Sequence, residues 1–255
     1  MAAPRSRRAT GMAEESEVPP KTREAEWFVP RFGPARFRAF AGLLFLPYTG
    51  MVLSFCAMGS MLAERINTER LWALLAIYFL GLGVGAHALD AMGGKGVKPW
   101  GRVFGNLELM LIATTSLAAA YALGIYYMVK AVPFLWPLAV LEGFFVFAYN
   151  LEWFGGRFHN DFWFSFSWGV LPTLAGYVMQ TNSLTMPPLI LATATGLLSA
   201  VEIKISRPYK ELRKRGACLE RGETALMARF ESLLKCISLG TILLGIALLY
   251  WRLFS

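Results

Sequence analysis

The chain has 255 residues, of which 56% are hydrophobic and only 16% charged, and its 25 Lys and Arg outnumber its 17 Asp and Glu to give a net charge of +8. Soluble domains carry about 25% charged residues, so this composition excludes a water-soluble enzyme, a disordered regulator and a secreted disulfide scaffold. It indicates a protein whose main solvent is lipid. The cysteines, Cys56, Cys218 and Cys236, are odd in number and widely spaced, which predicts neither a disulfide framework nor a CxxC metal site.

The first 36 residues are polar, rich in Arg, Glu, Ala and Pro. We interpret residues 1–36 as a disordered, basic cytoplasmic tail and residues 37–255 as a transmembrane helical domain. The tail does not resemble a secretory signal, because the first long apolar run begins only near Phe40.

Seven apolar runs follow, and each is close to the roughly 20 residues that a helix needs to cross the hydrocarbon core. The sequence therefore predicts an all-α, polytopic integral membrane bundle of about seven transmembrane helices. The expected spans cover residues 40–62, 71–89, 109–128, 132–149, 162–179, 184–201 and 233–251.

The basic residues predict the orientation of this bundle. With seven spans, the side opposite the N-terminus holds only Arg65, Arg70, Lys130 and Arg252, and the other Lys and Arg residues fall on the N-terminal side. Basic loops are retained in the cytoplasm, so we expect the N-terminus inside the cell and the C-terminus outside. The net positive charge is thus a signal of topology and does not indicate nucleic-acid binding.

Most of the polar residues near the apolar runs lie at the ends of the second, fourth and sixth predicted helices, which all meet the cytoplasmic face. Ionisable groups at membrane depth are costly and usually face a bundle interior or a water-filled cavity, which predicts a shared site there. Each of these residues alone is also compatible with a structural role near the lipid headgroups. Glu142 differs, because it lies about two turns inside the fourth helix and must be protonated, paired or lining a cavity.

Several of these polar side chains are candidate metal ligands. His87 and Asp90 are spaced i, i+3 and share one helix face, and Gly155 and Gly156 allow a sharp turn after the fourth helix. A carboxylate-rich ligand set would suit Mg²⁺ or Mn²⁺, whereas one with both histidines would suit Zn²⁺ or Fe²⁺. The candidate ligands are His87, Asp90, Glu108, Glu152, His159 and Glu202.

Basic and amide side chains in the same layer are candidate ligands for an anionic group such as a diphosphate. The basic segment from Lys204 to Arg221 also fits simple contact with anionic lipid headgroups. The candidates for substrate binding are Lys98, Arg102, Asn150, Arg157, Lys204 and Arg207.

This layout resembles the UbiA superfamily of intramembrane prenyltransferases, including an uncharacterised bacterial and archaeal branch of it. Asp90 falls at the central Asp of the family's first motif, N-x-x-x-D-x-x-x-D, and a basic Gly-Lys-Gly-Val-Lys-Pro stretch follows it. Tyr149 matches the tyrosine after the fourth helix. Glu202 with Arg207-Pro208 stands at the second Asp-rich motif.

The resemblance implies a UbiA-like fold in a bacterial or archaeal cell membrane and transfer of a prenyl group from an isoprenoid diphosphate to a hydrophobic acceptor. Asp90 and Glu202 would bind Mg²⁺, Lys98, Lys204 and Arg207 would neutralise the diphosphate, and Tyr149 would belong to the catalytic centre. The expected partners are membrane lipids, and no oligomeric state is predicted. The expected aromatic walls of the cavity are Phe145, Tyr149, Trp163 and Trp168.

Two other functions stay open at this point. In the first, His87, Asp90, Glu152 and His159 bind a transition metal that acts on another membrane lipid. In the second, the chain is a non-catalytic, lipid-binding membrane subunit. A transporter is not indicated, because the sequence has no paired halves with matching broken helices.

Overall fold

The computed structural model describes residues 26–93 and 103–254, and within these ranges the chain is helical with no strand. Lys98 and Arg102, two of the predicted anion ligands, lie outside the described residues. The elements in chain order are α1 (Ala35–Leu43), α2 (Leu46–Met61), α3 (Thr68–Tyr78), η2 (Phe79–Ala86), α4 (His87–Gly93), α5 (Asn106–Lys130), η3 (Pro133–Leu135), α6 (Trp136–Asn150), η4 (Trp153–Gly156), α7 (Asp161–Ser165), η5 (Phe166–Val170), α8 (Leu171–Thr181), α9 (Met186–Arg215), η6 (Gly216–Cys218) and α10 (Arg221–Phe254).

Five helical stretches are long and apolar enough to cross a membrane, and a sixth is added if α1 and α2, which are bent by 41° against each other, count as one span. The prediction of an all-helical membrane bundle is confirmed to this extent. The five stretches are Thr68–Met92, Asn106–Lys130, Pro133–Asn150, Met186–Arg215 and Arg221–Phe254.

The predicted span at residues 162–179 corresponds to α7, η5 and α8, which are not among these stretches. α8 packs closely against α2 and α9, and most of its side chains are buried. A helix enclosed by its neighbours can carry buried polar groups such as Thr173 and Gln180, which lower its hydropathy. The count of seven spans therefore stays a prediction.

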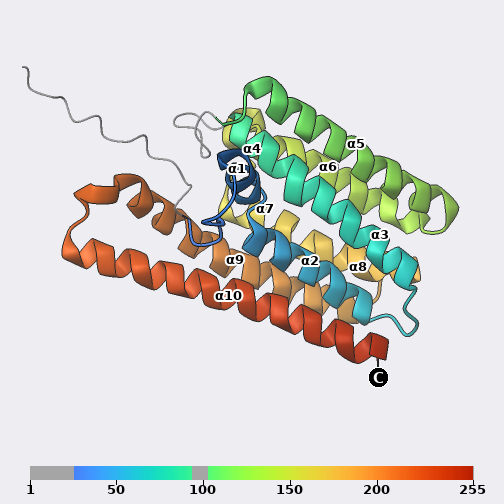
Figure 1. Ribbon diagram of the computed structural model, residues 1–255. Coiled ribbons are helices and arrows are strands. Elements are labelled where there is room, and N and C mark those ends of the chain that lie inside the picture. Colours follow the sequence, from blue (N-terminus) through green and yellow to red (C-terminus); the bar gives the residue numbers. More distant parts are fainter. Residues whose placement is uncertain (1–25, 94–102, 255) are drawn as a thin grey trace, which may run out of the picture.

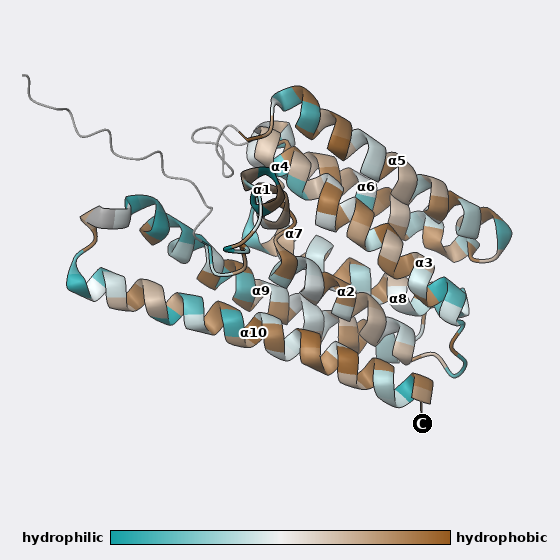
Figure 2. Cartoon of the chain, viewed as in Figure 1, coloured by the Kyte–Doolittle hydropathy of each residue, from teal (hydrophilic) through white to brown (hydrophobic). Residues whose placement is uncertain are grey.

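Large apolar side chains cover much of the outer surface of the bundle. Val140 on α6, Ile190 on α9 and Leu243 on α10 are each about two-thirds exposed, at 65%, 66% and 64%. Figure 2 shows apolar residues along the lengths of α5, α6 and α10. Such continuous apolar surface is unfavourable in water and favourable in hydrocarbon.

Small residues allow α2 and α8 to cross at close range. A Cβ atom on Gly59 would come within 2.0 Å of the carbonyl oxygen of Thr173, and one on Gly176 within 2.2 Å of the carbonyl oxygen of Cys56. The hydroxyl of Ser60 donates to the carbonyl of Gly176 at 3.1 Å. Close backbone approach with a hydroxyl contact is a common way of joining helices in lipid.

Two helices contain π-helical segments. The segment η2 continues α3 and leads directly into α4, which carries His87 and Asp90, and η5 contains Trp168. In η2, a Cβ atom on Gly83 would come within 2.7 Å of Thr49, and one on Gly85 within 2.8 Å of Leu117. π-helical turns are rare and frequently lie at functional sites.

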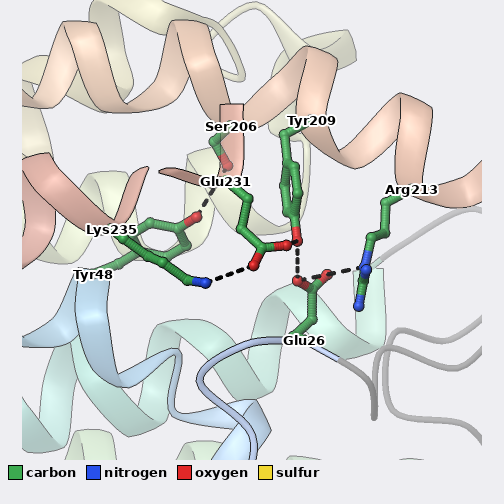
Figure 3. A network of polar contacts seen from close by, with 7 residues as sticks. All are labelled: Glu26, Tyr48, Ser206, Tyr209, Arg213, Glu231 and Lys235. Atoms are coloured by element: carbon green, nitrogen blue, oxygen red, sulfur yellow. Dashed lines mark hydrogen bonds and ion pairs between the residues drawn. The ribbon is translucent and has the colours of Figure 1, made fainter. Parts of the chain in front are cut away.

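The last part of the predicted disordered tail packs against the bundle. Glu26 is buried, and its carboxylate lies close to Tyr209 and Arg213 on α9 (Figure 3). The amine of Lys235 on α10 lies 5.4 Å from the centre of the Trp27 ring. The tail prediction thus differs from the structure at residues 26–30, where buried Glu26 makes polar contacts and Val29 belongs to the hydrophobic core, whereas residues 31–36 are exposed. Residues 1–25 lie outside the described part.

The helices run back and forth, so that the end of α4, the end of α6 and the start of α7 lie at one end of the bundle (Figure 1). α9 and α10 continue beyond this end as a helical hairpin. Its exposed residues include Lys214 and Arg215, which belong to the predicted basic segment. The arrangement brings the polar helix ends of the sequence into one layer.

Candidate functional site

The polar layer centres on four side chains from three helices and one loop. Tyr149 lies in the last turn of α6, His159 lies in the loop before α7, Asp161 begins α7 and Arg207 lies on α9. We call these four residues the Tyr149–Arg207 cluster. The His159 ring stacks on the Tyr149 ring with 4.4 Å between ring centres and 26° between ring planes.

The backbone reverses direction after α6 and so places His159 beside Tyr149. Glu152, Phe154, Gly155 and Gly156 all adopt positive φ angles between 51° and 79°. Glycine adopts this conformation without strain, whereas the two larger residues are held in it by their surroundings. The predicted sharp turn at Gly155 and Gly156 is confirmed.

The hydrogen bond of His159 determines which ring nitrogen is available. Its Nδ1 lies 3.0 Å from the carbonyl oxygen of Tyr149, which can only accept, so Nδ1 carries a hydrogen. His87 makes the same type of bond, at 3.0 Å, to the carbonyl of Gly83. In a neutral ring with this tautomer, Nε2 is the nitrogen that can accept a proton or bind a metal.

Arg207 brings an unsatisfied hydrogen-bond donor into the cluster. Its Nε lies 2.9 Å from Oδ1 of Asp161, and its guanidinium also lies near Tyr149. Its Nη2 is buried and has no hydrogen-bond partner in the part of the chain that the structure describes. Buried donors are nearly always paired, so an unpaired one indicates a position for a ligand that accepts hydrogen bonds.

Acidic groups flank the cluster on the side of α4 and α7. Asp90 and Asp161 both lie near enough to act on Tyr149 electrostatically, and Arg207 opposes them. The structure therefore brings together four residues that the sequence placed in one layer, Asp90, Tyr149, His159 and Arg207, and adds Asp161 to them.

A continuous set of aromatic contacts leads from this cluster to α2. Tyr149 contacts Phe164 at 5.9 Å between ring centres, and Phe164 stacks on Trp168 at 5.4 Å. Trp168 contacts His87 at 5.2 Å, and His87 stacks on Phe45 at 4.9 Å. The two histidines thus lie at different points of the aromatic set, with Trp168, Phe164 and Tyr149 between them.

Glu202 lies apart from the Tyr149–Arg207 cluster. It is only 3% exposed, and Lys210, two turns further along α9, is the cation that acts on it. The amine of Lys210 lies 5.6 Å from the centre of the Phe45 ring. This places Glu202 and Lys210 toward the far end of the aromatic set.

Other predicted site residues have structural partners or point to the surface. Glu108 pairs with Arg36 and accepts a hydrogen bond from the backbone of Gly105 at the start of α5. The amide of Asn150 donates to the carbonyl of Val146 within its own helix. Lys204 and Arg157 are exposed.

The expected aromatic wall is present in part. Phe145 stacks on Trp163 at 5.2 Å, and Trp168 belongs to the aromatic set described above. Phe45 and Phe164 were not predicted, and the sequence contains no pattern that distinguishes them from packing residues. Lys210 was counted only as part of a basic segment.

The predicted metal ligands do not form a group in the described ranges. Residues 26–93 and 103–254 contain no set of three or more His, Cys, Asp or Glu side chains placed to hold one ion. Glu108 and Glu202 are each near a cation of the chain itself. These side chains do not fit a bound Mg²⁺, Zn²⁺ or Fe²⁺ by themselves, and a requirement for metal stays a prediction.

Comparisons with known proteins give no family for this chain. No family model matches it, and no match was found among curated proteins or solved structures.

Proposed function

We propose that the chain is a prenyltransferase-like membrane enzyme whose Tyr149–Arg207 cluster binds the headgroup of an isoprenoid diphosphate. The observation that carries this proposal is the buried Nη2 of Arg207, which has no hydrogen-bond partner in the described residues. Asp161 pairs with the guanidinium on its Nε side, so Nη2 remains as a donor for a ligand.

The chemistry of a guanidinium supports a phosphate ligand. Arg presents several N–H donors in a planar fork that matches the oxygens of a phosphate. Exposed Lys204 and Arg157 stand on the same layer and can attract an anion toward it. The unpaired donor of Arg207 lies beside this positively charged surface. The site should therefore bind an anionic headgroup more tightly than a neutral lipid.

The aromatic set offers suitable surroundings for the allylic carbon, which is the reacting atom of the substrate. In prenyl transfer, the bond between the allylic carbon and oxygen breaks, and its electron pair leaves with the diphosphate. The carbon then bonds to the acceptor, which loses a proton. Aromatic faces such as Trp168 and Phe164 stabilise a developing carbocation.

Two members of the cluster have distinct roles in this reaction. Arg207 stabilises the charge that develops on the departing diphosphate. His159 offers Nε2 as the acceptor for the proton released by the hydrophobic acceptor molecule. Neither role depends on a bound metal.

The test is binding of geranylgeranyl diphosphate to the purified protein in lipid nanodiscs, with geranylgeraniol as the ligand that lacks the diphosphate. We expect preference for the diphosphate, and a roughly tenfold or larger loss of its affinity in Arg207→Gln. The matched control is Arg229→Gln, which removes the same charge from an exposed position on α10. Equal affinity for both ligands, or equal effects of the two substitutions, would contradict the proposal.

The same preparation distinguishes the alternatives. Binding with and without Mg²⁺, in wild type and Asp90→Ala, measures the metal requirement that the family resemblance implies. Bound Zn or Fe that is lost in His87→Ala and His159→Ala would favour the transition-metal enzyme. Tight diphosphate binding without release of inorganic diphosphate, when membrane lipid extract supplies the acceptor, would favour the non-catalytic subunit.

A further inference from the structure

A second feature lies deeper in the bundle, around Glu142 on α6. This residue is near the middle of the stretch Pro133–Asn150, about two helical turns before Tyr149. The hydroxyl of Tyr78 donates to Glu142 Oε1 at 2.8 Å. Oε2 is buried and has no hydrogen-bond partner among the described residues.

The Glu142 carboxyl lines a small, almost wholly apolar cavity of about 80 Å³. The cavity lies between α3, η2, α5, α6 and α8. Its walls include Tyr78, Leu117, Tyr121, Gly124, Glu142 and Ala175. Glu142, which has one unsatisfied oxygen, is therefore an acidic residue in the wall of a space that is lined mainly by apolar side chains.

A larger groove of about 350 Å³ adjoins this cavity on the side of α5 and α6. Tyr121, Met128 and Ala139 line both spaces. The two helices are consecutive in the chain, yet their backbones do not pack closely along their lengths. Exposed Val140 borders the groove, which places its opening on a lipid-facing surface.

Tyr121 occupies the boundary between the groove and the cavity. Its hydroxyl crosses the gap to α6 and lies against Gly143, where an added Cβ atom would come within 2.0 Å of it. Gly143 thus provides the space that this side chain needs. A change at Gly143 or Tyr121 would alter the passage between the two spaces.

The hydrogen bond from Tyr78 decides what the carboxyl can offer to a ligand. An ionised carboxylate without a cation costs several kcal/mol in the middle of a membrane, a cost that the neutral acid avoids. Oε1 accepts from Tyr78, so the neutral acid presents its hydrogen on Oε2. The cavity therefore offers one hydrogen-bond donor in apolar surroundings.

We infer that the groove and the cavity form a lateral binding site for a membrane-dissolved molecule with an apolar body and one carbonyl oxygen. The apolar body lies in the groove between α5 and α6, and the carbonyl accepts the hydrogen of Glu142. Such sites are mostly apolar, with a few polar groups that orient the ligand. This site does not depend on the function proposed for the Tyr149–Arg207 cluster.

The test uses 4-octylbenzophenone, an apolar photoreactive ketone, on the full chain in nanodiscs. Crosslinks located by mass spectrometry are expected on α5 and α6 beside the groove. 2-Dodecanone should compete for labelling roughly tenfold better than dodecane, because only the ketone accepts a hydrogen bond. Equal competition by the ketone and the hydrocarbon would overturn the inference.

Two substitutions test the role of the carboxyl. Glu142→Leu removes the donor and should abolish the preference for the ketone over the hydrocarbon. Glu142→Gln should keep most of it, because its amide can accept from Tyr78 and still donate to a ligand. Labelling of Glu142→Leu at the wild-type level with the ketone preference intact would also overturn the inference.

Two controls separate this site from other effects. Tyr126→Phe removes an exposed hydroxyl from the same helix as Tyr121 and should leave labelling unchanged. Arg207→Gln, which tests the diphosphate site, should also leave it unchanged. If Glu142→Leu does not fold, the competition between ketone and hydrocarbon for the wild-type protein still tests the inference.

Discussion

The hydroxyl of Tyr209 on α9 donates a hydrogen bond of 2.8 Å to Oε2 of Glu26, which lies 183 positions earlier in the chain. The same hydroxyl is 3.2 Å from Glu231 on α10, and Arg213 lies 3.8 Å from Glu26 (Figure 3). One tyrosine therefore links the N-terminal segment to both helices of the projecting hairpin.

Replacement of Tyr209 by Phe should release this segment. The buried Glu26 carboxylate would lose its shortest hydrogen bond, which we expect to destabilise the protein by about 1–3 kcal/mol. The checks are the thermal unfolding midpoint and the rate of trypsin cleavage after exposed Arg31. Tyr250→Phe, at an exposed position on α10, is the control. Identical cleavage rates in the two variants would show that the contact does not hold the segment.

Substitution of Gly176 by Ala should strongly destabilise the bundle. The new Cβ atom would lie 2.2 Å from the carbonyl oxygen of Cys56, so α2 and α8 would have to separate. Overpacking of this kind costs about 1–3 kcal/mol or more. Thermal unfolding in detergent measures the effect. Gly240→Ala, which has open space around it on α10, should be neutral or stabilising by up to about 1 kcal/mol.

A double-mutant cycle should reveal coupling between Lys210 and Glu202. Lys210→Met removes the cation that acts on buried Glu202, and we expect a loss of about 1 kcal/mol or less, because the buried carboxyl can stay neutral without it. In Glu202→Gln the same Lys210→Met change should have a smaller effect, because the amide carries no charge for the cation to act on. Unfolding midpoints of the four proteins give the coupling. Lys214→Met, at an exposed ion pair with Glu211, should have little effect.

The natural cysteines provide a test of the predicted orientation. Cys218 is exposed at the tip of the α9–α10 hairpin, whereas Cys56 is buried. A membrane-impermeant maleimide should label Cys218 in inside-out vesicles and fail to label it in intact cells. Cys218→Ser should remove most of the signal, and any remaining label reports exposed Cys236 on α10. Labelling of intact cells would place the hairpin, and with it the N-terminus, outside.

The sequence was sufficient to predict an all-helical bundle with long apolar helices and a polar layer at their ends. Apolar runs indicate the long helices, and the alternation of consecutive helices brings Asp90, Tyr149 and Arg207 to one end of the bundle. Both inferences depend on hydropathy and on the direction of the chain, and both properties can be read from the sequence.

The contacts within the layer could not be predicted in the same way. Which side chains meet depends on the rotation of each helix about its axis, so neither the pairing of Arg207 with Asp161 nor the contact of Phe45 with His87 could be predicted. The same limit explains why Glu108 and Glu202 were grouped with ligands that they do not join. Docking of Glu26 depends on a contact between distant segments, which local composition does not reveal.

The π-helical segment η2 gives the position of His87 and Asp90 an unusual dependence on chain length. A π turn contains one more residue than an α-helical path of the same extent, and each residue of an α-helix turns the chain by about 100°. Deleting a single residue between Phe79 and Ala86 would therefore convert the π turn to an α-helical path and leave His87 facing Phe45 and Trp168, whereas the same deletion within α3 would turn His87 away from them. The membrane would accept either deletion, but only the one in α3 would take the polar layer out of alignment.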